Sequence, residues 1–408
     1  MRTEIPALLA LLLLVPACRS GSAWKQGQSA YDRRDFQEAI RIWKPLAEQG
    51  VAEAQYRLGV VCEQGDGVPR NRQEAAAWFR KAAEQGILPA QVRLAGLLSR
   101  GDGVPADPAE ALKWQRKAAE QGNEEAQYRL ALACDQGDGL PKDRGEALKW
   151  YLRAAEKGNV QAQAIAADRF RRGDGTGKDP LQAAKWFRKA ADQGLAQAQW
   201  QLGWMAAQGE AMAKDPAQAV RYYRLAAEQG DPVAQSLLAG MLDRGEGVAK
   251  DTGAALKLYT SAAEAGVASA QSVLGWMCEH GEGTAKDPAA AQQWYRKAAD
   301  QGDAQARYLL GVLLNTAEGK RRNPAEAVKW FTLAAEQGHA LSRYALGFAY
   351  ADGDGVAKDL DQVYYWHLLA KAGGCEQSAE MLAWLETQLN PKEVAAIQKR
   401  AAETWRKG

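Results

Sequence analysis

The pattern of apolar and polar positions along this chain repeats every 36 residues, with neither insertion nor deletion. The alanine that opens each period recurs, with serine in the last two, at Ala54, Ala90, Ala126, Ala162, Ala198, Ala234, Ala270, Ala306, Ser342 and Ser378. A glycine closes each period, from Gly50 and Gly86 through to Gly374. Self-similarity at a fixed step of this length is typical of solenoids, in which neighbouring repeats bury a continuous core.

Each period is expected to form two helices joined by a tight turn. Ala54 and Leu58 are one helical turn apart, so they share the apolar face of the first helix. The sequence GDGV at 65–68 follows, and its two glycines permit a positive φ without steric cost. Asn71 is of a residue type that caps helix N-termini, and Gly86 is of the type that ends helices. The sequence therefore predicts an all-α fold of helix-turn-helix repeats.

The repeat also sets the expected organisation of the 408-residue chain. Residues 1–17 are predicted to be a signal peptide and residues 18–28 a short, lipid-anchored tether. Residues 29–51 contain half a repeat that ends in the standard glycine, so they are predicted to cap the stack. Nine full repeats follow at 52–375. Residues 376–408 lack the glycine turn and are predicted to be C-terminal capping helices, since terminal repeats have one face toward water.

The N-terminus resembles that of an exported bacterial lipoprotein. An apolar run from Ile5 to Val15 is too short to span a bilayer, which takes roughly 20 residues, but it has the length of a secretory signal. The sequence VPAC then ends at Cys18, which would be lipidated. The alternative is ordinary cleavage after Ala23. Arg19 after the cysteine favours the outer membrane over the inner one, so the predicted location is periplasmic and anchored to the outer membrane.

Charge and cysteine usage narrow the classes of function. The 52 basic and 50 acidic residues leave a net charge of +2 without a basic block, so nothing indicates nucleic-acid binding. Cys62, Cys134 and Cys278 occupy one repeat position that is apolar elsewhere, where cysteine behaves as a small hydrophobe. Because equivalent positions of different repeats lie too far apart, no structural disulfide is expected.

Candidate chemistry is sparse. The turns carry an acidic row, but a basic residue stands four positions on in most repeats, as Arg70 follows Asp66. Calcium needs several converging oxygen ligands, so a charge-balanced, solvated turn is the preferred interpretation. The three histidines, His280, His339 and His367, show no nucleophile or metal-ligand spacing. We therefore expect no enzyme, no metal and no cofactor.

The recurring residues AQxxLGxxxxxGxGVxxDxxxAxxWxxxAAxQG resemble the Sel1-like repeat family over about nine tenths of the chain. The resemblance implies a right-handed α/α superhelical solenoid related to tetratricopeptide repeats, with about nine repeats and terminal caps. It also implies an adaptor or scaffold role, usually without catalysis. Cysteine-rich secreted relatives carry a disulfide in each repeat; this chain lacks the two cysteines per repeat that they need, which leaves their penicillin binding unsupported here.

The positions that vary between repeats are the candidate partner-binding residues. They lie along the first helix, which lines the concave surface in tetratricopeptide-like repeats. Aromatic residues are common interface anchors, although here they could equally fill space between helices. The candidate partner-binding residues are Tyr56, Tyr128, Trp200, Trp204, Trp276, Tyr308, Tyr344 and Phe348.

These features predict a non-enzymatic interaction scaffold of the bacterial cell envelope. It would bind other envelope proteins along its concave surface and contact the membrane only through its lipid anchor. The first alternative is a lipoprotein that binds peptidoglycan or exopolysaccharide, or serves its secretion, with the aromatic residues as a stacking platform. A second is a periplasmic hydrolase of the penicillin-interacting kind.

Overall fold

The computed structural model describes residues 23–317 and 322–407, and within these ranges all regular structure is helical. The helix of the N-terminal half-repeat is α2 (Phe36–Glu48). The first helices of the nine repeats are α3 (Ala52–Gln64), α5 (Leu88–Arg100), α7 (Glu124–Gln136), α9 (Val160–Arg172), α11 (Ala196–Gln208), α13 (Pro232–Arg244), α15 (Ala268–His280), α17 (Ala304–Thr316) and α19 (Ala340–Asp352).

The second helices follow after the glycine turns, and two further helices end the chain. The second helices are α4 (Arg72–Glu84), α6 (Pro108–Glu120), α8 (Arg144–Glu156), α10 (Pro180–Asp192), α12 (Pro216–Glu228), α14 (Thr252–Glu264), α16 (Pro288–Asp300), α18 (Pro324–Glu336) and α20 (Leu360–Ala372). The C-terminal helices are α21 (Ser378–Gln388) and α22 (Pro391–Lys407). The all-α prediction is confirmed.

The turn between the two helices depends on glycine. Gly65 ends α3 in the left-handed conformation at φ 85°, and Gly67 has φ 73°. Most other repeats have the same pair, but Ala211 takes the second position in one repeat and still adopts φ 63°. A side chain is disfavoured there, which explains the paired glycines.

The second helix begins at the predicted cap. The side chain of Asn71 accepts a hydrogen bond from the backbone N–H of Glu74 at 3.0 Å, which satisfies one of the amides left unpaired at a helix start. Aspartate makes the same bond elsewhere, for example Asp107 with the N–H of Glu110 at 2.9 Å. The capping prediction is confirmed.

A ladder of glutamines links consecutive helices, and the sequence alone did not reveal its role. The buried side chain of Gln55 donates to the carbonyl of Ala47 at 3.0 Å. Gln85, at the end of α4, then donates to the Gln55 side chain at 2.8 Å. Gln91 and Gln121 repeat the arrangement one period later, at 3.2 and 2.9 Å. Buried amides paired in this way fix the register of adjacent repeats.

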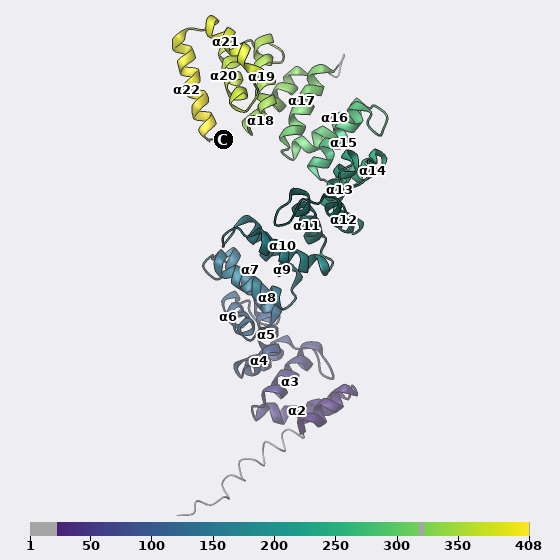
Figure 1. Ribbon diagram of the computed structural model, residues 1–408. Helices are drawn as coiled ribbons and strands as arrows, with labels where there is room; N and C mark the ends of the chain where they lie inside the picture. The colour runs from purple at the N-terminus through teal and green to yellow at the C-terminus, as the bar shows by residue number, and fades with distance from the viewer. Residues whose placement is uncertain (1–22, 318–321, 408) are drawn as a thin grey trace, which may run out of the picture. The chain divides into compact units, whose positions relative to one another are not determined.

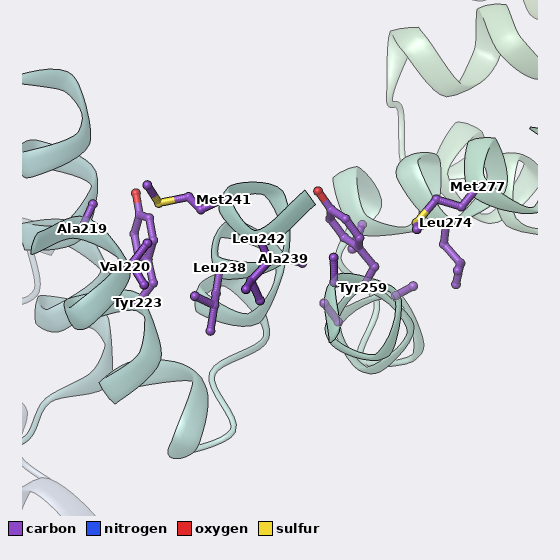
Figure 2. Close-up of a cluster of buried hydrophobic side chains, with 14 of the residues drawn as sticks. Ala219, Val220, Tyr223, Leu238, Ala239, Met241, Leu242, Tyr259, Leu274 and Met277 are labelled. Atoms are coloured by element: carbon purple, nitrogen blue, oxygen red, sulfur yellow. The ribbon is translucent and has the colours of Figure 1, made fainter. Parts of the chain in front are cut away.

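The chain divides into two compact parts, residues 1–195 and 196–408. Within each part, each first helix contacts the second helix of its own repeat and the helix that precedes it in the same part (Figure 1). Figure 2 shows the resulting core in the second part, where Tyr223 and Tyr259 take corresponding places in successive repeats. Each part thus buries its core between consecutive helices.

The N-terminal cap is larger than expected. Residues 23–28, assigned above to the tether, are helical, and the Trp24 ring stacks on Trp43 at 5.6 Å. Gly27 lies so close to Trp43 that an added Cβ would fall 2.4 Å from its ring nitrogen. The small, polar composition of this segment concealed the contact, which is made by its single tryptophan. The predicted signal peptide, Cys18 and the start of the tether lie outside the described residues.

The C-terminal cap forms as a packed group of helices. Leu382 and Leu385 of α21 and Ile397 of α22 are buried with Val363 and Leu369 of α20. The Tyr364 hydroxyl of α20 also donates to Glu386 at 2.8 Å. These contacts cover the apolar face that the last repeat would otherwise expose.

Candidate functional site

A buried ring joins the two helices of nearly every repeat. Phe79 of α4 lies against Gly59 of α3, where an added Cβ would come within 2.6 Å of the ring. The position after the repeat tryptophan is a buried ring in eight of the nine repeats, at Phe79, Tyr151, Phe187, Tyr223, Tyr259, Tyr295, Phe331 and His367. In the remaining repeat this position is Gln115. In these eight repeats the ring explains why the facing slot of the first helix is glycine or alanine.

The repeat tryptophan has a different role. Trp78 is half-buried and packs against two consecutive core clusters, so it fills the space between repeats as its bulk suggested. The Lys81 ammonium lies 4.3 Å from the centre of its ring. The sequence carries a signal for the ring position, because Phe or Tyr recurs directly after the repeat tryptophan.

Four of the candidate partner-binding tyrosines lie over these buried rings. The ring centres are 5.9 Å apart for Tyr56 and Phe79, and 6.0 Å for Tyr128 and Tyr151. They are 6.1 Å apart for Tyr308 and Phe331, and 5.4 Å for Tyr344 and His367. All four tyrosines are half-buried. Each therefore contributes one face to packing and leaves the rest accessible.

Trp276 and Phe348 are the most accessible members of the candidate set. Trp276 on α15 is 39 % exposed and stacks on His280, one turn later, at 4.5 Å. Phe348 on α19 is 37 % exposed and borders a hollow of about 170 Å³ beside Val312 and Phe331. Large apolar side chains with this exposure, on the face that varies between repeats, are suited to anchor a partner.

Trp200 and Trp204 of α11 differ from Trp276. Both are half-buried and pack against the core cluster drawn in Figure 2. Trp204 and Trp276 share one repeat position, yet Trp276 is exposed and Trp204 is half-buried. For the α11 pair, much of the ring area is already used within the protein.

Two titratable side chains near the first helices, His367 and Cys62, lie in apolar surroundings. Burial lowers the pKa of His367 to about 4 and raises the pKa of the Cys62 thiol to about 11. Cys62, Cys134, Cys278 and Cys375 are free thiols. In the described part of the chain, no group of three or more His, Cys, Asp or Glu side chains converges as a metal site. No described helix is both long and apolar enough to cross a membrane.

The architecture defines the class: an α-helical solenoid with a core of small residues and rings and a variable first-helix face. The Sel1 repeat family matches nine consecutive segments, 52–87, 88–123, 124–159, 160–195, 196–231, 232–267, 268–303, 304–339 and 340–375. The chain belongs to the Sel1 repeat family. Proteins of this family are generally protein-interaction scaffolds, and their solenoid is typically non-catalytic.

Two solved structures are similar to this chain over most of their own length. One is c5321, a protective antigen of uropathogenic Escherichia coli strains with an SLR fold, at 30 % identity and TM-score 0.63. That match covers 90 % of this chain and 94 % of the antigen. The other is a Sel1 repeat protein from Oxalobacter formigenes, at 32 % identity and TM-score 0.59, covering 74 % of this chain and 88 % of that one. No curated protein matches the chain.

Proposed function

We propose that this protein is a non-enzymatic scaffold of the bacterial cell envelope that binds partner proteins along the face of its first helices. The exposure of Trp276 and Phe348 carries the proposal, because both stand at positions that vary between repeats. The regular positions are occupied by caps, turns and core contacts, which leaves the variable face for recognition. An aromatic anchor that is already ordered loses little entropy when it binds.

The envelope location rests on the N-terminal sequence. The short apolar run, followed by VPAC with Cys18, is the arrangement of an exported lipoprotein. The similar protein from uropathogenic E. coli is described as a protective antigen, a property that suits a protein exposed outside the cytoplasm. Lipidation at Cys18 would anchor the N-terminus to the outer membrane and leave the repeats in the periplasm.

A lipoprotein that binds peptidoglycan or an exopolysaccharide is the second candidate function. The observation that favours it is the Trp276 ring, which is accessible and held in place by His280. A sugar ring can stack on the flat apolar face of an accessible aromatic side chain. Pull-down with purified peptidoglycan in the absence of other proteins separates the two functions, because the scaffold requires a protein partner.

The scaffold function is tested by cross-linking in cells followed by mass spectrometry, with and without the exposed rings. Trp276→Ala and Phe348→Ala should remove the cross-linked partner while the melting temperature changes little. A Cys18→Ser variant should lose membrane anchoring and cross-linking to outer-membrane neighbours. Unaltered fractionation of Cys18→Ser would overturn the lipoprotein assignment and leave the scaffold intact.

A further inference from the structure

One repeat lacks its internal ring. In residues 88–123, Gln115 stands where the other eight repeats bury an aromatic side chain. A hollow of about 270 Å³ opens at this place, lined by Ala95, Gly96, Arg100, Gln115 and Arg129 among others. Among the described residues, no hydrogen bond holds the Gln115 amide. The hollow is therefore a gap in the repeat pattern, bordered by small and charged side chains.

The repeat at 232–267 shows how the same place looks when it is filled. Gly240 and Arg244 correspond to Gly96 and Arg100, and Tyr259 corresponds to Gln115. The Tyr259 hydroxyl and the Arg244 guanidinium meet beside Gly240, where an added Cβ would lie 3.2 and 3.1 Å from them. Figure 2 shows Tyr259 among the buried side chains of this core.

At Gly96 only the cation is present. An added Cβ would lie 3.4 Å from Nη1 of Arg100, and the three atoms nearest to it all belong to the Arg100 guanidinium. Arg244 is paired with Glu246 at 3.0 Å. The acid in the corresponding place near Arg100 is Asp102, which is paired with Arg72 instead. Arg100 thus faces the hollow without an acidic partner in the described part of the chain.

The opposite wall shows a second vacant contact. Arg93 lies 5.9 Å from the centre of the Phe79 ring and also pairs with Glu63. Arg129 occupies the same position one repeat later, over the place where Gln115 has replaced the ring. It pairs only with Glu125 of its own helix, at 2.6 Å between largely exposed side chains. A guanidinium in this position is suited to cover an aromatic face supplied from outside.

We propose that this hollow binds an aromatic side chain of a partner protein that has a carboxylate beside it. The ring takes the place that Tyr259 and its equivalents fill in other repeats, between Ala95 and the Arg129 guanidinium. The carboxylate pairs with Arg100, which is the uncompensated charge of the lining. The inference rests on the proposed scaffold function and specifies the partner chemistry at one repeat.

The test uses the full-length protein and three dipeptide probes. Acetyl-Tyr-Glu-amide carries the ring and the acid, acetyl-Tyr-Gln-amide only the ring, and acetyl-Ala-Glu-amide only the acid. Saturation-transfer NMR should show contact to the tyrosine ring of the first probe and the strongest binding for it. In Arg100→Gln its affinity should fall roughly five- to tenfold, as for one charge-assisted hydrogen bond at a partly exposed site.

Variants that fill the hollow supply the second readout. Gln115→Phe restores the ring of the other repeats and should abolish binding of all probes. The substitution should fold, because an alanine slot accommodates a ring elsewhere, as Ala131 does with Tyr151. Gln115→Met fills less space and is the alternative if the phenylalanine variant does not fold. Arg244→Gln is the matched control for Arg100→Gln, because Tyr259 already fills the corresponding place in that repeat. The Arg244→Gln variant should bind the probes like wild type.

Equal binding of the three probes, binding retained in Gln115→Phe, or no saturation transfer from any probe would overturn the inference. None of these outcomes affects the scaffold proposal, which is tested separately at Trp276 and Phe348. Retention of the cross-linked partner by Trp276→Ala and Phe348→Ala, with unchanged dipeptide binding, would remove the scaffold proposal and leave the hollow as a binding site.

Discussion

Ala211 holds a left-handed backbone at φ 63°, in the turn position where the other described repeats have glycine. A Cβ in this region destabilises the folded state by roughly 1–2 kcal/mol. Glycine avoids that cost, but its greater freedom in the unfolded chain offsets part of the gain. Ala211→Gly should therefore raise the free energy of unfolding by about 0.5–1 kcal/mol. Urea denaturation of the purified variant measures this change in the free energy of unfolding. A variant less stable than wild type would show that the Ala211 methyl group makes a compensating contact.

His367 takes the place of the buried ring in the last repeat. It is fully buried, accepts or donates one hydrogen bond with Ser378 at 3.1 Å through Nδ1, and has no partner at Nε2. The neighbouring side chains Tyr344 and Phe348 pack edge-on against the imidazole. Such surroundings disfavour the charged form, which is why burial lowers the pKa to about 4.

This burial makes stability depend on pH. The imidazole has a pKa of 6.5 in the unfolded chain and of about 4 in the folded protein. Between these pH values the unfolded state binds a proton and the folded state does not. Stability from this group is present above pH 6.5 and is lost as the pH falls toward 4. Between pH 7 and pH 5 the loss should be about 2 kcal/mol.

His367→Phe removes the titrating group and restores the ring found at Phe79 and Phe331. The variant should lose less stability than wild type between pH 7 and pH 5, by about the same 2 kcal/mol, in urea titrations at both pH values. Acidic residues and His339, whose pKa is also lowered by burial, contribute equally to both proteins and cancel in the difference. An identical pH dependence in the two proteins would refute the role of His367.

At the scale of elements, the close approach of the two helices in each repeat depends on the facing small residue. Gly59→Ala would place a methyl group 2.6 Å from the Phe79 ring, so the ring or helix must shift. Overpacking of this kind should cost about 1–3 kcal/mol, more than the helix propensity gained by alanine. The midpoint of urea denaturation, at unchanged slope, measures the loss.

Gly96→Ala is the matched control, since it is also a first-helix glycine. There the nearest atoms are the mobile end of Arg100 at 3.4 Å, with no ring beneath. This variant should be neutral or slightly more stable, by up to about 1 kcal/mol. Equal destabilisation by the two substitutions would mean that the buried ring does not set the helix spacing.

The elements were largely predictable from the sequence because their determinants are local. The cap at Asn71, the turn glycines Gly65 and Gly67 and the closing glycine each act within a few residues, and each recurs with the period. The packing of residues distant in sequence was not visible in the same way. The Gln55–Gln85 pair and the contact of Trp24 with Trp43 depend on how helices meet, which periodicity alone does not specify.

The candidate site was predictable only in part. Its position on the first helices and its aromatic character follow from the variable slots. Which rings are accessible does not, because exposure depends on neighbouring side chains: Trp204 and Trp276 share one slot and differ in burial. The hollow at Gln115 could have been found from the sequence, as the one interruption in a column of rings.

At the scale of the whole molecule, the regular residues and the irregular ones have separate tasks. The rings, glutamine pairs and caps recur because each repeat must pack on the next, and stability of such arrays is approximately a sum over repeats and interfaces. Partner recognition, under the proposal above, belongs to the slots that vary. Substitutions in exposed variable slots should therefore change binding with little change in stability.

The most direct test of this separation compares cross-linking and melting for two pairs of aromatic residues. Trp276→Ala with Phe348→Ala removes exposed rings, whereas Trp200→Ala with Trp204→Ala removes rings packed against the core. The account predicts that the first double variant stays folded and loses its cross-linked envelope partner, and that the second melts at a lower temperature than the first. Retention of the partner by a correctly folded Trp276→Ala, Phe348→Ala protein would contradict it.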